Sequence, residues 1–195
     1  MALLSAGERR PHLARWSLIL GCMAGTVAGE ARAQEVPGAL EEEVKAAYLL
    51  NFTRYVDWPP GSFPGPESPV NLCVFGDPRF GEIARRTVDG RRSRGRPVRV
   101  LLPDAPDLAS GCHVAFVGGS RAEIARRLAA LAPTAALTVG DGRDFLDRGG
   151  IITFVIVNET VRFEIHPDAA RRAGLELSSR LLALATRLHP EPKAR

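Results

Sequence analysis

The sequence is poor in the residues that build metal and catalytic sites. Its 195 residues include only three cysteines and four histidines, and no pair of ligands stands at the spacing of a structural zinc site. The phosphate-binding motif GxxxxGKS/T, a complete GxGxxG fingerprint and the nucleophile motif GxSxG are all missing. The sequence therefore gives no support to an enzyme of these kinds, and we expect neither a metal nor a cofactor.

A long hydrophobic run is also missing. The longest uncharged apolar stretch, WSLILGCMAGTVAG at residues 16–29, is too short to span a bilayer comfortably. Basic residues precede it, and Ala31-Arg32-Ala33 follows it with small side chains where signal peptidase needs them. The basic residues are Arg9, Arg10 and Arg15. This pattern predicts a secretory signal peptide that is cleaved near Ala33.

The leader indicates the compartment. Its arginines are typical of a bacterial signal peptide, so we expect a mature chain, residues 34–195, that folds as one domain in the periplasm. Leu20-Gly21-Cys22 faintly resembles a lipoprotein processing site. Only about five apolar residues precede that cysteine, so we favour the cleaved, unlipidated form.

Lysine is scarce, and the basic charge is carried by arginine. Without the leader, 22 basic and 20 acidic side chains remain. Five arginines gather in DGRRSRGRPVR at residues 89–99. We interpret this patch as a solvated loop, with an anionic polymer or an acidic partner as the alternative. An exported protein does not meet nucleic acid, so none is expected as a partner.

Two cysteines survive processing, Cys73 and Cys112, each beside a predicted strand. Because the periplasm oxidises thiols, we predict a disulfide between them. The chain-entropy model gives a bridge that closes a loop of this length about 4 kcal/mol of stability. Two separate buried thiols are the alternative.

The clearest predicted helix covers residues 39–56, where apolar side chains recur at steps of three or four residues. Pro59 disfavours helical geometry at Trp58, so the helix must end there. A tryptophan at this point either lines a ligand or partner site or packs on the domain and fixes the helix end. We favour packing.

Alternating strands and helices predict an α/β domain with a mostly parallel central sheet, flanked by helices. Asn158-Glu159-Thr160 between the last two strands predicts a hairpin, and therefore an antiparallel C-terminal pair. Strands are expected at residues 70–75, 97–102, 112–117, 136–139, 151–157 and 161–165. Further helices are expected at residues 79–87, after Ser120, at 143–147, and at 167–188 with a break near Gly174.

No set of residues predicts catalysis. Ser120 follows two glycines, but Arg121 stands where a nucleophile elbow needs another pattern. His113 lies in a buried strand pattern, and we expect it to be satisfied in the core. The remaining acidic candidates resemble turn and helix-surface residues; they are Asp141, Asp144 and Asp147. We therefore expect a protein that is not an enzyme.

One strand carries an unusual polar face. Arg162, Glu164 and His166 alternate with apolar residues, so a strand places their side chains on the same side. This face could bind a partner or a small polar ligand. The alternative is the solvent face of an edge strand.

Several segments together resemble one family. Over residues 44–188 they are VKAAYLLNFTRYVDWPPGSF, VNLCVFGDPRFGEI, GCHVAFVGG, LTVGDGRDFLDRGGIITFVIVNETVRFEI and DAARRAGLELSSRLLALA, in this order. The sequence resembles the YfiR/HmsC-like family of bacterial periplasmic proteins.

The resemblance implies a regulator without catalytic activity. Its characterised members bind the periplasmic region of an inner-membrane diguanylate cyclase and hold it inactive, which lowers cyclic di-GMP and biofilm formation. An OmpA-like outer-membrane lipoprotein can sequester such a repressor, and members tend to form homodimers. The alternative is a small-molecule binding module that signals to a histidine kinase or another sensor.

The resemblance also assigns residues. Cys73 and Cys112 match a cysteine pair of the family, whereas a second pair falls on Leu146 and Thr153 and is missing here. Glu164 matches a position implicated in partner contacts. Arg172 lies in the same region and is the second partner-binding candidate.

Overall fold

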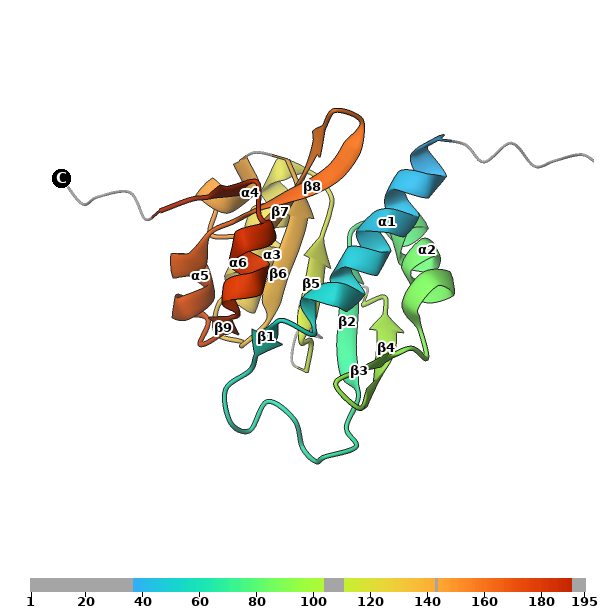
Figure 1. Cartoon of the computed structure of the whole chain (residues 1–195), viewed down its shortest axis with the longest axis vertical. Helices are drawn as coiled ribbons and strands as arrows, with labels where there is room; N and C mark the ends of the chain where they lie inside the picture. Colours follow the sequence, from blue (N-terminus) through green and yellow to red (C-terminus); the bar gives the residue numbers. More distant parts are fainter. Residues whose placement is uncertain (1–36, 104–110, 143, 191–195) are drawn as a thin grey trace, which may run out of the picture. The chain divides into compact units, whose positions relative to one another are not determined.

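The structure is a computed structural model that describes residues 37–103, 111–142 and 144–190 (Figure 1). The predicted signal peptide lies outside these residues. Within them, no helix has both the length and the apolar character that crossing a membrane requires. The described residues belong to the compact unit Glu35–Arg195.

An eight-stranded sheet forms the centre of this unit, in the order β10-β8-β7-β6-β5-β2-β4-β3 (Figure 1). The strands β4, β2, β5, β6 and β7 run parallel to one another, whereas β3 pairs antiparallel with β4 and β8 returns antiparallel to β7. The α/β class and the antiparallel C-terminal pair predicted from the sequence are confirmed. The strands are β2 (Val70–Phe75), β3 (Arg92–Ser93), β4 (Arg96–Leu101), β5 (Val114–Val117), β6 (Leu137–Asp141), β7 (Ile152–Val157), β8 (Thr160–Ile165) and β10 (Arg187–Leu188).

Helices α2 and α3 begin where the sequence supplies capping groups. Asp77 accepts a hydrogen bond from the Phe80 backbone N–H at the start of α2. Ser120 and Glu123 form a capping box at the start of α3, as their spacing predicts. The helices are α1 (Pro37–Phe52), α2 (Pro78–Val88), α3 (Arg121–Leu131), α4 (Asp144–Asp147), α5 (Pro167–Arg172) and α6 (Ser179–Leu184).

The central strands β2, β5 and β6 are buried on both faces, and their alternate side chains point to opposite sides of the sheet. On one face, Leu72 of β2 lies in a core with Leu49 of α1 and Phe80 of α2. On the other face, its neighbour Cys73 lies in a second core with Leu128 of α3. The two cores place α1 and α2 on one side of the sheet and α3 and α4 on the other.

The β7–β8 hairpin turns through Asn158 and Glu159, which both have positive φ, at 49° and 58°. This geometry is typical of a two-residue turn whose twist suits antiparallel strands. Phe163 of the hairpin meets Phe52 of α1 edge to face, with ring centroids 5.0 Å apart. The predicted hairpin is therefore present, and it packs against the first helix.

Gly150 explains part of the Arg-Gly-Gly-Ile-Ile sequence. The ring of Phe145 packs so closely against Gly150 and Gly140 that a Cβ at either glycine would overlap it. Gly149 has φ 91°, which favours glycine as well. These glycines allow α4 to fold back tightly onto the sheet before β7 begins.

Two predicted helices differ from the structure. The first ends at Phe52 rather than at residue 56, and β1 (Val56–Asp57) pairs antiparallel with β9 (Glu176–Leu177). The prediction of one helix over 167–188 with a break near Gly174 is wrong in its second half. Gly174 has φ 74°, so the chain turns there, enters β9, forms α6 and ends in β10.

Candidate partner surface around helix α5

The three polar residues predicted on one strand face have different environments. Arg162 is exposed, Glu164 is partly buried and His166 is buried. The His166 side chain accepts a hydrogen bond from the Ala169 backbone N–H, 3.3 Å away, and so caps α5. With 7% of its surface exposed, His166 supports the helix, whereas Arg162 and Glu164 lie on the outer side of the strand.

Glu164 does not lie on an edge strand, so that alternative is wrong. β10 pairs parallel with β8 outside it, with Arg187 opposite Glu164. The Glu164 carboxylate lies 2.6 Å from Nε2 of His189, and 19% of its side chain is exposed. The carboxylate therefore has a defined position beside the short last strand.

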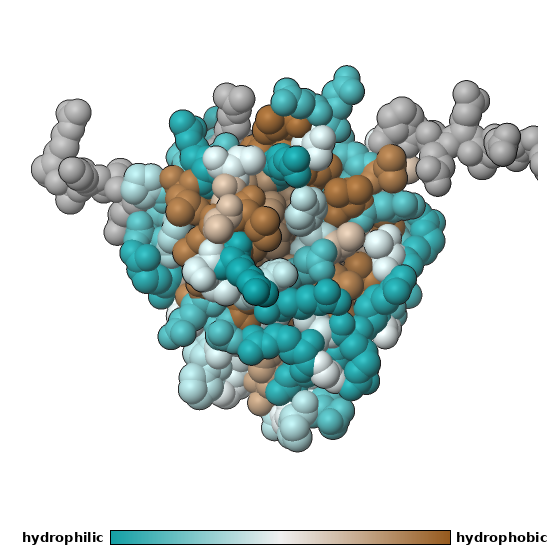
Figure 2. All heavy atoms as spheres, viewed as in Figure 1, coloured by the Kyte–Doolittle hydropathy of each residue, from teal (hydrophilic) through white to brown (hydrophobic). Residues whose placement is uncertain are grey.

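The margin formed by α6 and β10 exposes large apolar residues. Leu184 and Leu188 are both exposed there, close in sequence to His189. Leu40, Val44, Ile156 and Val157 are the other exposed large apolar residues among those described. Figure 2 shows apolar residues gathered over the part of this face that carries α1, α6 and the β7–β8 hairpin. Apolar residues gathered in this way are typical of a surface that contacts another molecule.

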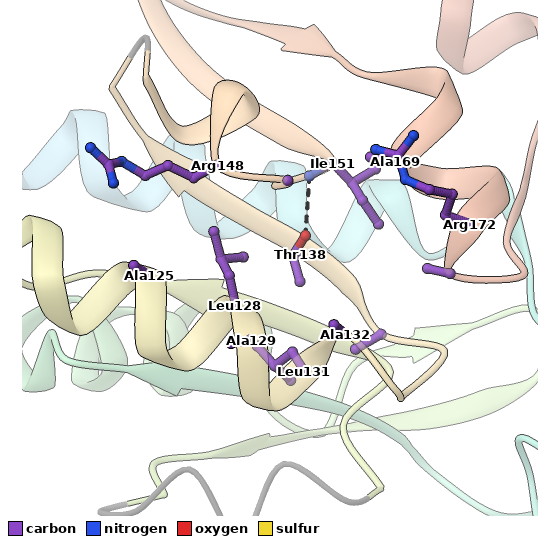
Figure 3. A pocket seen from close by; sticks show the side chains of 13 residues that line it. Ala125, Leu128, Ala129, Leu131, Ala132, Thr138, Arg148, Ile151, Ala169 and Arg172 are labelled. Carbon is purple, nitrogen blue, oxygen red and sulfur yellow. Dashed lines mark hydrogen bonds between the residues drawn. The ribbon is translucent and has the colours of Figure 1, made fainter. Parts of the chain in front are cut away.

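Helix α5 separates two hollows. A larger one, of about 610 Å³, lies between α3 and α5 and is lined by Arg172 (Figure 3). A smaller one, of about 230 Å³, lies between α5 and α6 and is lined by Arg171. Most of the smaller hollow is lined by apolar side chains, namely Pro167, Leu175, Leu177 and Leu182. Glu176 adds a negative charge to its lining. Two adjacent arginines therefore serve different sides of one short helix.

Trp58 follows the C-terminal end of α1 and belongs to an aromatic cluster with Phe63 and His113. Its indole N–H donates to the His113 backbone carbonyl, 3.2 Å away, and its ring meets Phe63 edge to face. The guanidinium of Arg96 lies 4.1 Å above the Phe63 ring. Trp58 also lines a hollow of about 290 Å³ with Arg94 and Arg96, and we keep its packing role as a proposal.

His113 and Ser120 have separate structural tasks. The two ring nitrogens of His113 contact the Asn71 backbone N–H and the Ser62 carbonyl, at 3.1 and 2.9 Å. The Ser120 hydroxyl lies 2.6 Å from the Glu123 carboxylate in the capping box. Among the described residues, no three or more acidic, histidine or cysteine side chains are grouped so as to hold a metal ion.

The sequence did not predict the contacts of Lys45. Its ammonium lies 2.7 Å from Glu41 and 3.1 Å from Asp141, and 11% of its side chain is exposed. Burial alone would lower the pKa of Lys45, but the hydrogen bonds and charges of the two carboxylates raise it. The spacing of Glu41 and Lys45 on one helix could have indicated their contact. Asp141, which follows 96 residues later, could not be found in this way.

The disulfide between Cys73 and Cys112 is present, with Cα atoms 5.8 Å apart. The positions assigned to a second family pair hold other groups. Leu146 is buried in the core on that face, and the Thr153 hydroxyl lies 2.8 Å from the Gly142 carbonyl. In this chain the two positions contribute apolar packing and a hydroxyl hydrogen bond.

Comparison with one of two solved structures supports the fold. A conserved domain protein from Vibrio cholerae is similar with a TM-score of 0.56 and 12% sequence identity, over 76% of this chain and 60% of that chain. The ABC domain from Streptococcus pneumoniae in complex with L-Trp has a TM-score of 0.44 and 9% identity, over 62% of this chain and 55% of that one. The chain thus spans less than two thirds of either structure, and neither indicates a function.

Comparison of sequences is more specific. No curated protein matches the sequence. The YfiR/HmsC-like family matches residues 42–186, a region that includes every helix and strand described above except the start of α1 and the last strand. The chain therefore belongs to the YfiR/HmsC-like family.

Proposed function

We propose that this protein is a periplasmic regulator that binds the periplasmic region of an inner-membrane sensor and holds the sensor inactive. The family is known for periplasmic regulators of diguanylate cyclases, so a cyclase is the first candidate and a histidine kinase the second. The protein itself catalyses nothing in this proposal. It acts by covering a surface that the sensor needs for activation.

The surface around α5 is the observation that supports this proposal. The smaller hollow offers an apolar floor with one positive and one negative residue, Arg171 and Glu176. Leu184 of α6 and Leu188 of β10 are exposed apolar residues that follow in the chain. An apolar pocket with charged surroundings fits an aromatic or aliphatic anchor of a partner, which is the usual arrangement of a binding hot spot.

Regulation then follows from differential binding. A repressor shifts its sensor towards the inactive state only to the extent that it binds that state more tightly. A second partner that occupies the same surface removes the repressor by competition. An OmpA-like outer-membrane lipoprotein would act in this way, and a homodimer formed through this surface would also compete.

Charge reversal at Arg171 tests the proposal. Arg171 is exposed and contacts Asp168 of its own helix, so its replacement should leave the fold intact. We expect Arg171→Glu to weaken binding of the captured sensor region by about tenfold or more, because one charge contact is reversed. Arg180→Glu on α6 is the matched control, since Arg180 is exposed and does not line the hollow.

Crosslinking in intact cells identifies the sensor, and the same variants are then compared with the purified periplasmic region. Deletion of the gene should raise cyclic di-GMP, and the Arg171→Glu variant should restore the low level poorly. Equal binding by both variants would remove the α5 surface from the proposal. Capture of no membrane sensor at all would overturn the regulatory function.

A further inference from the structure

The larger hollow, between α3 and α5, exists because its walls are made of small side chains. Ala125 and Ala129 line it from α3 and Ala169 lines it from α5 (Figure 3). Ala132 and Ala173, which directly follow α3 and α5, line it as well. Since these side chains stop at Cβ, the two helices leave a space of about 610 Å³. This volume lies within the usual range for small-molecule sites.

The floor of the hollow is apolar with one polar group. Leu128, Leu131 and Ile151 are buried and supply the apolar surface. Thr138 lies among them with 6% of its surface exposed. Its hydroxyl oxygen accepts a hydrogen bond from the Ile151 backbone N–H, 3.1 Å away (Figure 3).

The hydroxyl hydrogen of Thr138 has no acceptor among the residues that the structure describes. A hydroxyl can donate one hydrogen bond as well as accept, and a buried donor without a partner costs free energy. An oxygen of a bound molecule would supply the acceptor. This unused hydroxyl donor of Thr138 is an observation independent of the alanine-lined walls, and it points to a bound molecule that carries a polar atom.

The charged residues that line the hollow are both arginines, Arg148 and Arg172, and Figure 3 shows them at opposite ends. Asp144 does not line the hollow; it lies 3.2 Å from Arg148 and 3.1 Å from Arg121, so that one carboxylate faces two guanidinium groups. In Figure 3 the Arg148 guanidinium extends away from Ile151, whereas that of Arg172 lies beside Ala169. Both charged side chains that line the hollow are therefore positive, which favours an anion, and the Arg172 guanidinium lies at the α5 wall.

We infer that this hollow binds a small amphipathic anion, such as a medium-chain or aromatic carboxylate. The apolar body lies on Leu128, Leu131 and Ile151, and the anionic group lies against Arg172. The Thr138 hydroxyl donates to an oxygen of the ligand. An amine of the same size would meet two guanidinium groups, and a sugar would leave most of its hydroxyl groups unpaired against apolar walls.

The position of the hollow suggests a regulatory role for the ligand. α5 is only six residues long, and it forms one wall of this hollow and one wall of the hollow on the partner surface. A bound anion that orders or shifts α5 would change the affinity for the sensor. This link rests on the proposed function, whereas binding of the ligand does not.

Octanoate is a suitable probe, and octylamine is its matched control with the same number of carbon atoms and the opposite charge. Isothermal titration of the purified chain should detect octanoate binding, with octylamine weaker by about tenfold or more, which is the effect of one favourable charge contact. Arg172→Gln should weaken octanoate binding several-fold, whereas Arg171→Gln, on the other side of α5, should not. If octylamine bound as tightly as octanoate, the inference that the ligand is an anion would be wrong.

A second pair of variants tests the location. Ala129→Leu fills the hollow and should reduce octanoate affinity by about tenfold. Ala122→Leu adds the same side chain to an exposed position of α3 that does not line the hollow, and should leave the affinity unchanged. Circular dichroism verifies the fold, and Ala125→Leu replaces Ala129→Leu if the latter does not fold.

Two outcomes contradict the inference. The first is the absence of octanoate binding to the wild-type chain, and the second is binding that the filled variant retains. If the hollow is instead covered by a second copy of the chain, sedimentation will show a dimer that Ala129→Leu dissociates, and octanoate will not bind. Sensor capture is measured separately, so failure of ligand binding leaves the proposed regulatory function standing.

Discussion

The imidazole of His113 lies face to face on the ring of Phe63, with centroids 4.2 Å apart and planes 8° from parallel. Nδ1 accepts a hydrogen bond from the Asn71 backbone N–H, so the proton of the neutral ring is on Nε2, which donates to the Ser62 carbonyl. This one side chain ties the loop after Trp58 to the start of β2. It follows Cys112 directly, so the disulfide fixes the same place.

The first prediction concerns pH. Burial lowers the pKa of His113, and the nearby charge of Arg96 lowers it further, outweighing the Ser62 hydrogen bond. The unfolded chain therefore takes up this proton at a higher pH than the folded chain does. The contribution of His113 to stability is full above about pH 6.5 and is lost as the pH falls from there through the lower folded pKa.

Urea unfolding at a series of pH values measures this effect. The wild type should lose stability between pH 7 and 5 more steeply than His113→Gln, although the variant is less stable by about 1–3 kcal/mol at pH 7 because buried hydrogen bonds are removed. Carboxylates titrate in both proteins, so the difference between the slopes isolates the imidazole. Parallel slopes would mean that the ring is not held neutral in the folded chain.

The second prediction concerns the disulfide. Replacing Cys73 and Cys112 together by alanine should lower the free energy of unfolding by about 2–4 kcal/mol, because the unfolded chain gains conformational freedom. Denaturant melts of the double variant and of the wild type without reductant give the difference. Thiol labelling of the exported protein under denaturing, non-reducing conditions should modify neither cysteine, and labelling of both would contradict the bridge in the cell.

The third prediction concerns Lys45, which joins α1 to the carboxyl end of β6. Lys45→Met keeps the aliphatic part of the side chain and removes the charge. We expect a loss of about 1–2 kcal/mol, less than for a fully buried pair, because the side chains of both carboxylates are more than one third exposed. Thermal and urea unfolding measure it.

Arg79→Met is the control for Lys45→Met. Arg79 forms an ion pair with Glu42 from α2 to α1, at 3.5 Å, but its own side chain is mostly exposed, so its loss should have little effect. Because the pKa of Lys45 is raised in the folded chain, its effect on stability depends on pH. The contribution of Lys45 to stability is full below about pH 10.4 and is lost as the pH rises through the folded pKa. Equal stability of the two variants would show that Lys45 is no more important than a surface pair.

These contacts also show which parts of the fold the sequence could predict. The hairpin at Asn158-Glu159 and the capping box at Ser120 are local patterns, and both are present. Residues 167–188 contain many good helix formers, yet pairing of Glu176–Leu177 with Val56–Asp57 overrides that preference. Such pairing joins segments that are distant in sequence, and no local periodicity records it.

The candidate site remains a prediction. Strand alternation singled out Arg162, Glu164 and His166, and a resemblance singled out Glu164 and Arg172. Alternation could not show that His166 caps a helix. Six of the thirteen residues that line the larger hollow are alanines, which are common in any helix. Only the packing of α3 against α5 makes their small size significant.

The last prediction separates two roles of Glu164. Its carboxylate holds His189 at 2.6 Å, so a variant could lose partner binding either directly or because β10 detaches from β8. Glu164→Arg removes the contact and reverses the charge, whereas His189→Ala removes the contact and leaves the carboxylate in place. If Glu164 meets the partner directly, Glu164→Arg should weaken sensor capture by about tenfold or more while His189→Ala changes it little.

Melting temperatures of both variants complete this comparison. Because the pair is only partly buried, both should remain folded, with a loss of at most about 1 kcal/mol. Equal loss of capture in both would assign Glu164 to holding the last strand, and the partner would then contact β10 itself. Unchanged capture in both would remove this margin from the binding surface and leave the hollow beside Arg171 as its centre.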